Sequence, residues 1–389
     1  MNKNLLFIIS DMESGGFQKS LISLFRCLDY KKYNVDLLVL NSQGIFLSEI
    51  PNEVAIHKFD FLSSMLKPFP KCINELLKEK EFILAYKRTI QFLIARIDKG
   101  RGGVYLSKMI PSIEKEYDVA IDYNGQHLLY YMVDKIKAKK KISYFHSDYQ
   151  NWDYYFSADK KYYPKVDNIV TISDICKKSL DDYFPDCASK TRVVHNISSP
   201  KTINKMAAAE CPIKFDNTYI NIVMVGRPSE VKGYDFAIAA CEKLKRNGYK
   251  IRVYAIGTSN EVNKFKGLVD RLEIAKEFIF VGETENPYTF IRQADIYLHP
   301  SRFEGKSVAI DEAKILQKPI ILSSFTTAKD HIDNEVNGLI VDMSSEGVYK
   351  GIVRLIEEES LKEKLISNLK KENYGNEEEV LKFYELIEQ

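Results

Sequence analysis

Apolar residues in this chain gather in short runs, separated by segments with helical periodicity. In the first half these runs have the length of strands, and the first of them, Leu5–Ser10, is nearly continuous, which is typical of a parallel strand covered on both faces. They cover Leu5–Ser10, Val35–Leu40, Val54–Phe59, Tyr117–Asp122, Lys141–Phe145, Asn168–Ser173 and Arg192–Asn196. Strands that alternate with helices predict a doubly wound, mostly parallel sheet.

The same alternation starts again in the second half. A strand at Tyr219–Val225 precedes a helical segment at Tyr234–Asn247, which Gly248 ends. Further strand-like runs follow at Ile251–Ile256, Phe278–Val281, Asp295–His299, Ile320–Ser323 and Gly338–Val341. The sequence therefore predicts an α/β protein with two Rossmann-like, doubly wound domains.

The boundary between the two domains is predicted from composition. Residues 198–216 have no strong period and contain Pro200 and Pro212, so we place the linker there. The first domain then covers residues 1–200 and the second covers 201–375. Residues 376–389 have a helical pattern and are mostly acidic, and we expect that this helix can cross back and pack on the first domain.

Residues 62–117 differ from the rest of the first half because they are basic. They hold eleven Lys or Arg against six Asp or Glu, a local excess of five positive charges, with apolar residues such as Phe82, Phe92 and Leu93 between them. One interpretation is a basic helical insert that makes peripheral contact with an anionic membrane surface. The other is a solvated basic face over an ordinary core.

The overall composition excludes several classes of protein. Hydrophobic residues make up 45% and charged residues 28% of the 389 residues, unlike disordered or membrane-embedded chains. The net charge of +2 gives no electrostatic reason to expect nucleic-acid binding. Six cysteines are scattered without metal-ligand spacing, so we expect reduced thiols and a cytoplasmic protein. The apolar run near the N-terminus is too short for a membrane span and reads as a first strand.

The segment Ser301–Ala313 joins a predicted strand to a predicted helix and carries two carboxylates. Glu304 lies in the loop, followed by Gly305, and Glu312 lies in the helix, for which Ser307 is the expected N-cap. A helix start at the carboxyl end of a parallel strand presents free NH groups that bind anions. Because carboxylates repel a bare anion, we interpret them as acceptors for hydroxyl groups of a ligand with both phosphate and polyol parts.

Two cations follow the first strand of the second domain. Arg227 and Lys232 lie beside a predicted helix start, at the sheet edge where the Glu304 loop is expected. A planar guanidinium fork and a mobile ammonium suit one phosphate group. The alternative is two solvated side chains.

Two features of the first domain also lie at strand ends. Gly15 and Gly16 stand between the first strand and the first helix, where they allow a ligand close to the backbone. His146 ends a later strand and is placed to meet a ligand. A plain turn and a histidine bonded to neighbouring backbone are the alternatives.

Together these motifs resemble those of the retaining glycosyltransferases of the GT-B fold, specifically glycosyltransferase family four. The resemblance is densest from about residue 219 to 341 and thinner, but collinear, before that. It rests on Gly15-Gly16, on Arg227 and Lys232 in GRPSEVKG, on Asn286-Pro287-Tyr288 after Val281-Gly282, and on the E-x7-E segment from Glu304 to Glu312. The fold that it implies has two Rossmann-like domains facing across a cleft.

The resemblance also implies a role for each of these positions. Arg227 and Lys232 would bind the diphosphate of a nucleotide sugar, Glu304 the hydroxyl groups of the donor sugar, and Glu312 those of the ribose. His146 would contact the donor sugar near the reacting carbon. The remaining donor-binding positions act largely through the backbone: Gly15 and Gly16, the loop Gly305, Lys306, Ser307 and Val308, and, around the base, Gly257, Gly282, Asn286 and Pro287. Catalytic roles are assigned to Glu304, His146, Lys232 and Arg227.

The sequence departs from the family pattern at two places. Phe17-Gln18 stands where many relatives carry a small residue and a glutamate, and Lys306 stands where many carry an aromatic residue. Lys306 adds a cation beside the expected phosphate, and it makes the sugar preference harder to predict.

The expected chemistry is cleavage of a sugar–diphosphate bond. Arg227, Lys232 and a helix N-terminus would stabilise the charge on the leaving phosphate. No Asp-x-Asp occurs in the chain, so neither a metal ion nor another cofactor is expected. The resemblance implies retention of anomeric configuration, by front-face attack in which the leaving phosphate accepts the proton. A glycosidase-like use of Glu304 as nucleophile and Glu312 as acid is the disfavoured alternative.

We therefore predict a retaining, metal-independent glycosyltransferase that moves a hexose or N-acetylhexosamine from a nucleotide sugar, with UDP-sugars favoured over those of GDP or ADP. The acceptor would be a glycan, a lipid-linked glycan or a protein. The predicted location is cytoplasmic, with peripheral contact at the inner face of the cell membrane left open. The alternatives are a nucleotide-sugar epimerase or hydrolase of the same architecture, and a non-catalytic, glycosyltransferase-like partner protein.

Overall fold

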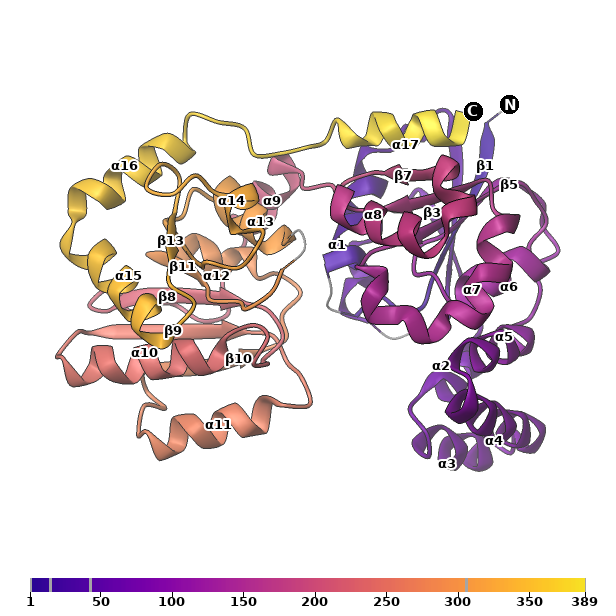
Figure 1. Ribbon diagram of the computed structural model, residues 1–389, viewed down its shortest axis with the longest axis horizontal. Coiled ribbons are helices and arrows are strands. Elements are labelled where there is room, and N and C mark those ends of the chain that lie inside the picture. The colour runs from indigo at the N-terminus through magenta and orange to yellow at the C-terminus, as the bar shows by residue number, and fades with distance from the viewer. Residues whose placement is uncertain (1, 14–15, 42–43, 305–306, 389) are drawn as a thin grey trace. The chain divides into compact units, whose positions relative to one another are not determined.

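The computed structural model describes residues 2–13, 16–41, 44–304 and 307–388, and the chain divides into two compact units. The first unit comprises Met1–Ile197 and Glu378–Gln389, and the second comprises Ser198–Glu377. Each unit is built around one parallel sheet with helices on both faces (Figure 1). The α/β class with two Rossmann-like halves, predicted from the alternating pattern, is confirmed.

The described part of the first unit has seven parallel strands in the order β3-β2-β1-β4-β5-β6-β7. The strands are β1 (Lys3–Ile9), β2 (Tyr33–Val39), β3 (Val54–Lys58), β4 (Tyr117–Asp122), β5 (Ala138–Phe145), β6 (Asn168–Thr171) and β7 (Thr191–Val193). The α-helices are α1 (Gly16–Cys27), α2 (Asp60–Leu66), α3 (Lys71–Lys78), α4 (Phe82–Ile97), α5 (Lys99–Met109), α6 (His127–Lys135), α7 (Phe156–Tyr162), α8 (Asp174–Tyr183) and α17 (Glu379–Glu388). Short 3-10 helices lie at η1 (Ile45–Glu49), η2 (Tyr149–Tyr155), η3 (Tyr163–Lys165) and η4 (Pro185–Lys190).

Strand β1 shows why its apolar run is continuous. Leu5, Phe7 and Ile9 point into a core shared with α1 and α17, whereas Leu6 and Ile8 point into a second core on the opposite face, shared with α6 and α7. Because successive side chains of a strand alternate between faces, a strand covered on both sides must be apolar throughout.

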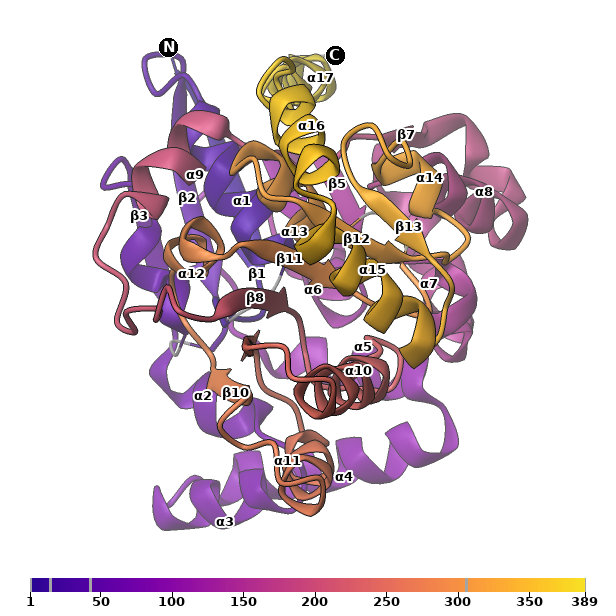
Figure 2. The same cartoon turned by 90° about the vertical axis from the view of Figure 1, so that its left-hand side faces the viewer.

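The described part of the second unit has six parallel strands in the order β10-β9-β8-β11-β12-β13 (Figure 2). The strands are β8 (Ile220–Val225), β9 (Ile251–Ile256), β10 (Phe278–Gly282), β11 (Ile296–His299), β12 (Ile320–Ser323) and β13 (Leu339–Val341). The helices are α9 (Pro200–Ala207), α10 (Tyr234–Arg246), α11 (Val262–Arg271), α12 (Tyr288–Gln293), α13 (Val308–Ile315), α14 (Ala328–His331), α15 (Ser345–Glu357) and α16 (Glu359–Leu369).

Helix α9 corrects the prediction that residues 198–216 are an irregular linker. Ser199 caps it by accepting a hydrogen bond from the Thr202 amide at 3.2 Å, and Pro200 occupies the first turn. Ile203 and Ala207 are buried in the core that α12 and α13 line. The short apolar face of this helix is stabilised by packing, which a pattern of eight residues does not show on its own.

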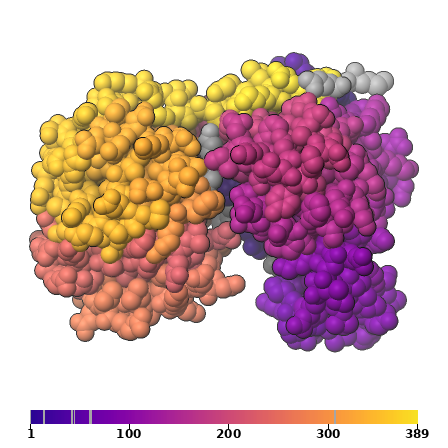
Figure 3. Space-filling view, viewed as in Figure 1, coloured from indigo at the N-terminus to yellow at the C-terminus, as the bar shows by residue number. Residues whose placement is uncertain are grey.

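The basic segment of the first unit folds as the helices α2 to α5. Helix α5 packs on α6 and α7, while α4 packs on α3 and α5. The space-filling view shows these helices as a violet lobe that projects from the rest of the first unit (Figure 3). Among the described residues, no helix combines the length and the apolar character that crossing a membrane requires.

Candidate functional site

The strand order of the second sheet reverses at β8. Strands β9 and β10 extend from one side of β8, and β11, β12 and β13 extend from the other, so the loops after β8 and β11 leave neighbouring strands in opposite directions. In open α/β sheets the carboxyl ends at such a switch point form the ligand crevice. The two loops here are residues 226–233 and 300–307.

These two loops are in direct contact. Gly233 has φ of +66°, and a Cβ at this position would lie 1.9 Å from the carbonyl oxygen of Pro300. The Arg302 amide donates to the Val231 carbonyl at 2.7 Å. The Arg302 guanidinium forms two parallel bonds, of 2.7 and 2.6 Å, with the Asp235 carboxylate at the start of α10. The backbone of one loop is therefore fixed against the other.

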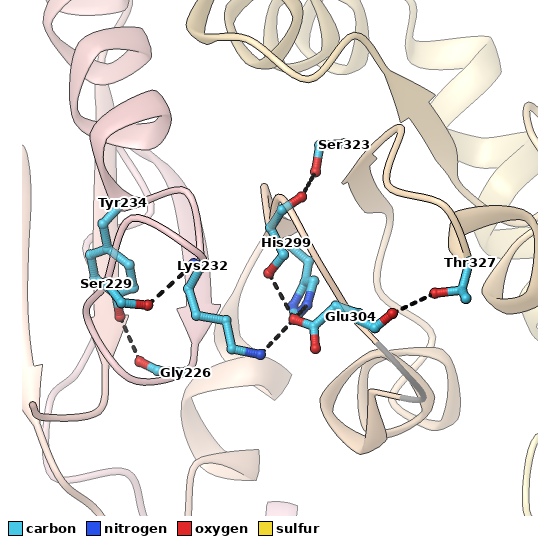
Figure 4. A network of polar contacts seen from close by, with 9 residues as sticks. Gly226, Ser229, Lys232, Tyr234, His299, Glu304, Ser323 and Thr327 are labelled. Carbon is cyan, nitrogen blue, oxygen red and sulfur yellow. Dashed lines mark hydrogen bonds and ion pairs between the residues drawn. The ribbon is translucent and has the colours of Figure 1, made fainter. Parts of the chain in front are cut away.

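This arrangement brings Lys232 and Glu304 together (Figure 4). Oε1 of Glu304 accepts from Lys232 Nζ at 2.6 Å, from His299 Nε2 at 2.6 Å and from Ser301 Oγ at 2.7 Å. No described residue donates to the other carboxylate oxygen, Oε2. The Glu304 residue is only 9% exposed, so the cluster lies at the bottom of the loop pair.

The charge state of Glu304 follows from these neighbours. Burial alone would raise its pKa, but the hydrogen bond from His299 and the positive charge of Lys232 outweigh burial and hold the pKa well below the usual range. Glu304 is therefore ionised at neutral pH. An ionised carboxylate with one oxygen to which no described residue donates is suited to accept hydrogen bonds from hydroxyl groups.

The Glu304 loop is also fixed from the side of β12. Thr327 Oγ1 donates to the carbonyl of Glu304 at 2.9 Å, and Ser323 Oγ donates to the carbonyl of Ser301. Three strand ends, those of β8, β11 and β12, therefore hold the loop that carries the carboxylate.

Arg227 is placed differently from Lys232. Its side chain is exposed and forms no hydrogen bond or ion pair with the residues that the structure describes. Its turn is ordered by the backbone, because Tyr234 Oη donates to the carbonyl of Gly226 at 2.8 Å and Ser229 Oγ accepts from the Lys232 amide at 3.2 Å. The structure thus pairs Lys232 with Glu304 and leaves Arg227 available to an anion.

Glycines end the three strands on the other side of the crevice. Gly226 comes directly after β8, Gly257 comes directly after β9, and Gly282 is the last residue of β10. The Gly257 amide donates to the Gly282 carbonyl at 2.8 Å. A Cβ on Gly257 would lie 2.3 Å from the carbonyl oxygen of Gly226. Beyond them, Asn286 Nδ2 donates to the Met206 carbonyl at 2.7 Å, and Pro287 is the residue before α12. The backbones at Gly226 and Gly257 are therefore closely packed, whereas a Cβ on Gly282 would meet no atom within 4 Å, so a flat ring could approach the backbone there.

Helix α13 carries the second predicted carboxylate. Glu312 is buried, and Tyr288 Oη donates to its Oε1 at 2.8 Å. Ser307 occupies the N-cap position before Val308, but its side chain makes no capping hydrogen bond, so that part of the prediction was wrong. Gly305 and Lys306 lie outside the described residues.

The remaining predicted positions belong to the first unit. Gly16 is the exposed first residue of α1, and Gly15 lies outside the described residues. The ring of Phe17 stacks on His146 at a centroid distance of 5.4 Å, and Tyr123 lies at 4.7 Å from the same ring. The start of α1 and the end of β5 therefore meet at one edge of the first sheet.

His146 is held as a neutral imidazole. Burial lowers its pKa to about 4, against weaker opposing effects of the Tyr123 backbone and the Asn196 side chain. Neither ring nitrogen makes a hydrogen bond of good geometry with a described residue. A buried imidazole at a strand end, whose contacts with the described residues Tyr123 and Asn196 are weak, can bind a hydroxyl group as donor or as acceptor.

The sequence argument missed three residues that bond to Glu304, namely His299, Ser301 and Thr327, and it also missed Arg302, which joins the two loops through Asp235. For His299 a signal existed, because it ends strand β11 just as His146 follows β5. For Ser301, Arg302 and Thr327 no local pattern distinguishes a loop side chain that turns inward from one that stays in solvent.

Comparisons with known proteins show what the chain resembles in sequence and in fold. Residues 211–372 match the family model described as glycosyl transferases group 1. An uncharacterized glycosyltransferase of Methanocaldococcus jannaschii is 22% identical over 45% of this chain and 44% of its own length. The N-acetylgalactosamine-N,N'-diacetylbacillosaminyl-diphospho-undecaprenol 4-alpha-N-acetylgalactosaminyltransferase of Campylobacter jejuni is 22% identical over 51% of this chain and 53% of its own. The chain spans 44%, 63% and 55% of the lengths of three Methanocaldococcus jannaschii relatives that it matches.

Solved structures share the fold over the whole chain. HepE of Anabaena, in complex with UDP and glucose, has a TM-score of 0.67 at 14% identity and covers 100% of both chains. A TarM variant of S. aureus, in complex with UDP among other ligands, has a TM-score of 0.65 at 11% identity, again over 100% of both chains. The protein therefore has the GT-B fold. Residues 211–372 of its second unit match the glycosyl transferases group 1 model, and the Lys232–Glu304 pair lies within the matched segment.

Proposed function

We propose that this protein is a retaining glycosyltransferase that works without a metal ion and moves a hexose or N-acetylhexosamine from a nucleotide sugar to a glycan, a lipid-linked glycan or a protein. The observation that carries the proposal is the Lys232–Glu304 pair at the switch point of the second sheet. It lies within the segment that matches glycosyl transferases group 1.

The two oxygens of Glu304 support separate tasks. Oε1 is occupied by Lys232, His299 and Ser301, which fixes the carboxylate in position. Oε2 has no donor among the described residues, and in the proposal it accepts hydroxyl groups of the donor sugar. A carboxylate that is already oriented loses little freedom when the sugar binds, which favours binding in one pose.

The cations take the diphosphate in this mechanism. Arg227 has no partner in the described structure and binds the phosphate oxygens directly, while Lys232, fixed by Glu304, adds positive charge close to the sugar–phosphate bond. Positive groups that are in place before the bond breaks stabilise the charge that develops on the leaving diphosphate. This is the task for which other transferases use a divalent metal.

A UDP-sugar is the donor that we favour. Support comes from the related fold of HepE, whose structures hold UDP, UDP with glucose, or UDP-glucose. The names of two curated relatives, the Campylobacter transferase and a capsular polysaccharide biosynthesis glycosyltransferase of Staphylococcus aureus, support a glycan or a lipid-linked glycan as acceptor.

The test begins with binding. The purified chain is titrated with UDP, GDP, ADP and CMP by calorimetry, and we expect UDP alone to bind in the micromolar range typical of a donor nucleotide. Lys232→Ala and Arg227→Ala should weaken that binding. Arg271→Ala, which removes an exposed cation at the end of α11 of the same unit, is the matched control and should leave it unchanged. No binding of any nucleotide would favour the non-catalytic alternative.

Turnover is then measured as release of UDP from UDP-sugars with candidate acceptors. Glu304→Gln should lower kcat by about two orders of magnitude, because it removes a preorganised charge from the site. NMR of the product should show the anomeric configuration of the donor, and EDTA should leave the rate unchanged. An inverted product would refute the retaining mechanism, and a loss of activity that manganese restores would refute the metal-free one.

A further inference from the structure

Helix α4 of the first unit turns large apolar side chains to the outside. Phe82, Ile83, Tyr86, Leu93 and Ile97 are between 56% and 90% exposed, and we call them the outer stripe. By the helical repeat of 3.6 residues per turn, these five side chains fall within a sector of about 100°. Single exposed apolar residues are ordinary, but five on one face of one helix are not.

The inner face of α4 fixes this orientation. Gln91 Nε2 donates to the carbonyl of Gly102 in α5 at 3.1 Å, and Arg88 Nε donates to the carbonyl of Met65 in α2 at 3.0 Å. A Cβ on Gly102 would lie 2.4 Å from the Cβ of Ala95, so α4 and α5 pack at close range through small residues. Rolling α4 to bury its outer stripe would break both hydrogen bonds and this contact. The stripe is therefore a feature of the folded lobe.

The charges beside the stripe within α4 are positive, whereas one acidic residue stands at each end of the helix: Glu81 precedes Phe82, and Asp98 follows Ile97 and pairs with Arg101 at 3.5 Å. The sequence of α4 contains no acidic residue, and its two exposed cations, Lys87 and Arg96, project about 40° beyond the two edges of the stripe by the helical repeat. Neither forms an ion pair with a described residue. An apolar face bordered on both sides by unpaired cations is complementary to a surface that is apolar below and anionic above.

We propose that the outer stripe of α4 docks the first unit on the surface of an anionic lipid bilayer. The apolar side chains enter the boundary between headgroups and acyl chains, and Lys87 and Arg96 lie at the level of the lipid phosphates. The helix lies on the membrane without crossing it. The proposal stands independently of the proposed transferase activity, because it uses no residue of the candidate site.

Vesicle flotation of the full-length chain tests it. At low salt the protein should float with vesicles of equimolar phosphatidylglycerol and phosphatidylcholine and remain at the bottom with pure phosphatidylcholine. Replacing both cations, Lys87→Gln with Arg96→Gln, should weaken partitioning by about fivefold per cation, and raising the salt concentration should do the same for the native chain. The double variant Ile83→Ser with Ile97→Ser should lose at least about tenfold, because buried methyl and methylene groups no longer enter the bilayer.

The matched control replaces two apolar residues that are more than half exposed on other helices of the same unit, Ile175→Ser in α8 with Leu381→Ser in α17. This variant should float like the native chain. Absence of flotation with anionic vesicles at low salt would overturn the proposal, and so would equal flotation of all the variants. A concentration-dependent dimer that the Ile83→Ser, Ile97→Ser variant abolishes would assign the stripe to a second copy of the chain and overturn it as well. All the substituted side chains are exposed, so we expect the melting temperature of each variant to equal that of the native chain.

Discussion

The two oxygens of the Glu304 carboxylate differ in their contacts with the described residues. Three donors converge on Oε1, and none of them is adjacent to Glu304 in the sequence: His299 ends β11, Ser301 follows it, and Lys232 comes from the loop after β8. The spacing from Glu304 to Glu312 was sufficient to single out both carboxylates. It could not predict that one is held by an ion pair and the other by Tyr288, because those partners meet only through long-range strand pairing.

Arg227 gives the clearest test at this scale, because its side chain forms no hydrogen bond or ion pair with a described residue that the substitution would break. We expect Arg227→Ala to weaken UDP binding by about 10- to 100-fold, since a hydrogen bond to a charged group contributes roughly 1.5–3 kcal/mol. The melting temperature should stay within error of the native value. Calorimetric titration and thermal unfolding measure the two quantities.

The control for Arg227 is Arg271→Ala. Arg271 is another exposed arginine of the second unit, at the end of α11, away from the strand ends that form the site. Its removal should change neither quantity. If both variants bound UDP as tightly as the native chain, the assignment of Arg227 to the diphosphate would be wrong.

At the scale of elements, the two loops of the site are fixed by a contact between backbones. The turn of the β8 loop at Gly233 brings its backbone against Pro300, and only a residue without Cβ fits there. The sequence predicted both loops, because each follows a buried apolar run and precedes a helical period. It did not predict their contact, because nothing in the local pattern shows that β8 and β11 are neighbours in the sheet.

A pair of glycine substitutions isolates this contact. Gly233 and Gly248 both have positive φ, +66° and +83°, but a Cβ on Gly248 meets no atom within 4 Å. Both alanine variants should lose about 1–2 kcal/mol from the left-handed backbone. Gly233→Ala should lose a further 1–3 kcal/mol, because the Pro300 backbone must move away.

The displacement of the loop should also reach Glu304, so Gly233→Ala should lower UDP-sugar turnover while Gly248→Ala should not. Urea unfolding and UDP release measure the two effects. If both variants lost the same free energy of unfolding, the β8 and β11 loops could move apart without destabilising the fold. The contact between Gly233 and Pro300 would then not hold the two loops together.

Helix α17 is held at its start by a pH-sensitive contact. Glu379 accepts from the amide and from Nδ1 of His195, at 3.0 and 3.2 Å, and from Lys382 Nζ at 2.7 Å. Burial alone would raise the pKa of Glu379, but the hydrogen bonds from His195 and Lys382 dominate and lower it from 4.5 to about 2. A carboxylate with a lowered pKa stabilises the fold above its unfolded value and loses that contribution as the pH falls.

The expected result is a stability difference between the native chain and Glu379→Gln that is full above pH 4.5 and disappears as the pH approaches 2. Urea midpoints measured at a series of pH values give this difference directly. Glu385→Gln, on the exposed side of the same helix, should match the native chain throughout. A difference that is constant with pH would mean that Glu379 acts through packing and not through its charge.

At the scale of the whole molecule, the chain passes from the first unit to the second and returns. The repeated alternation of strands and helices predicted two parallel sheets, because covered strands are apolar throughout. The order of the strands is a long-range property that periodicity does not contain. Because Asn373–Gly375 separates the last helix from the second domain, the sequence led us to expect that this helix can pack back on the first domain. In the structure α17 packs on the first sheet through Phe383, Leu386 and Ile387.

The contribution of α17 to the first unit can be measured separately from the second unit. The chain has one tryptophan, Trp152, and it lies in the first unit against Phe145. Its fluorescence during urea unfolding therefore reports that unit alone. Phe383 is fully buried and its ring stacks on Phe7 at 5.8 Å, so Phe383→Ala should lower the stability reported by Trp152 by about 3–5 kcal/mol.

Leu381 provides the control on the same helix, because it is 59% exposed, and Leu381→Ala should change the fluorescence midpoint by less than about 0.5 kcal/mol in stability. UDP binding by the second unit, measured without denaturant, should be the same in both variants, since neither residue belongs to that unit. Identical midpoints for Phe383→Ala and Leu381→Ala would mean that α17 rests on the first unit without stabilising it. A lower midpoint in Phe383→Ala alone would establish that a unit begun at the N-terminus of the chain is completed by residues at its C-terminus.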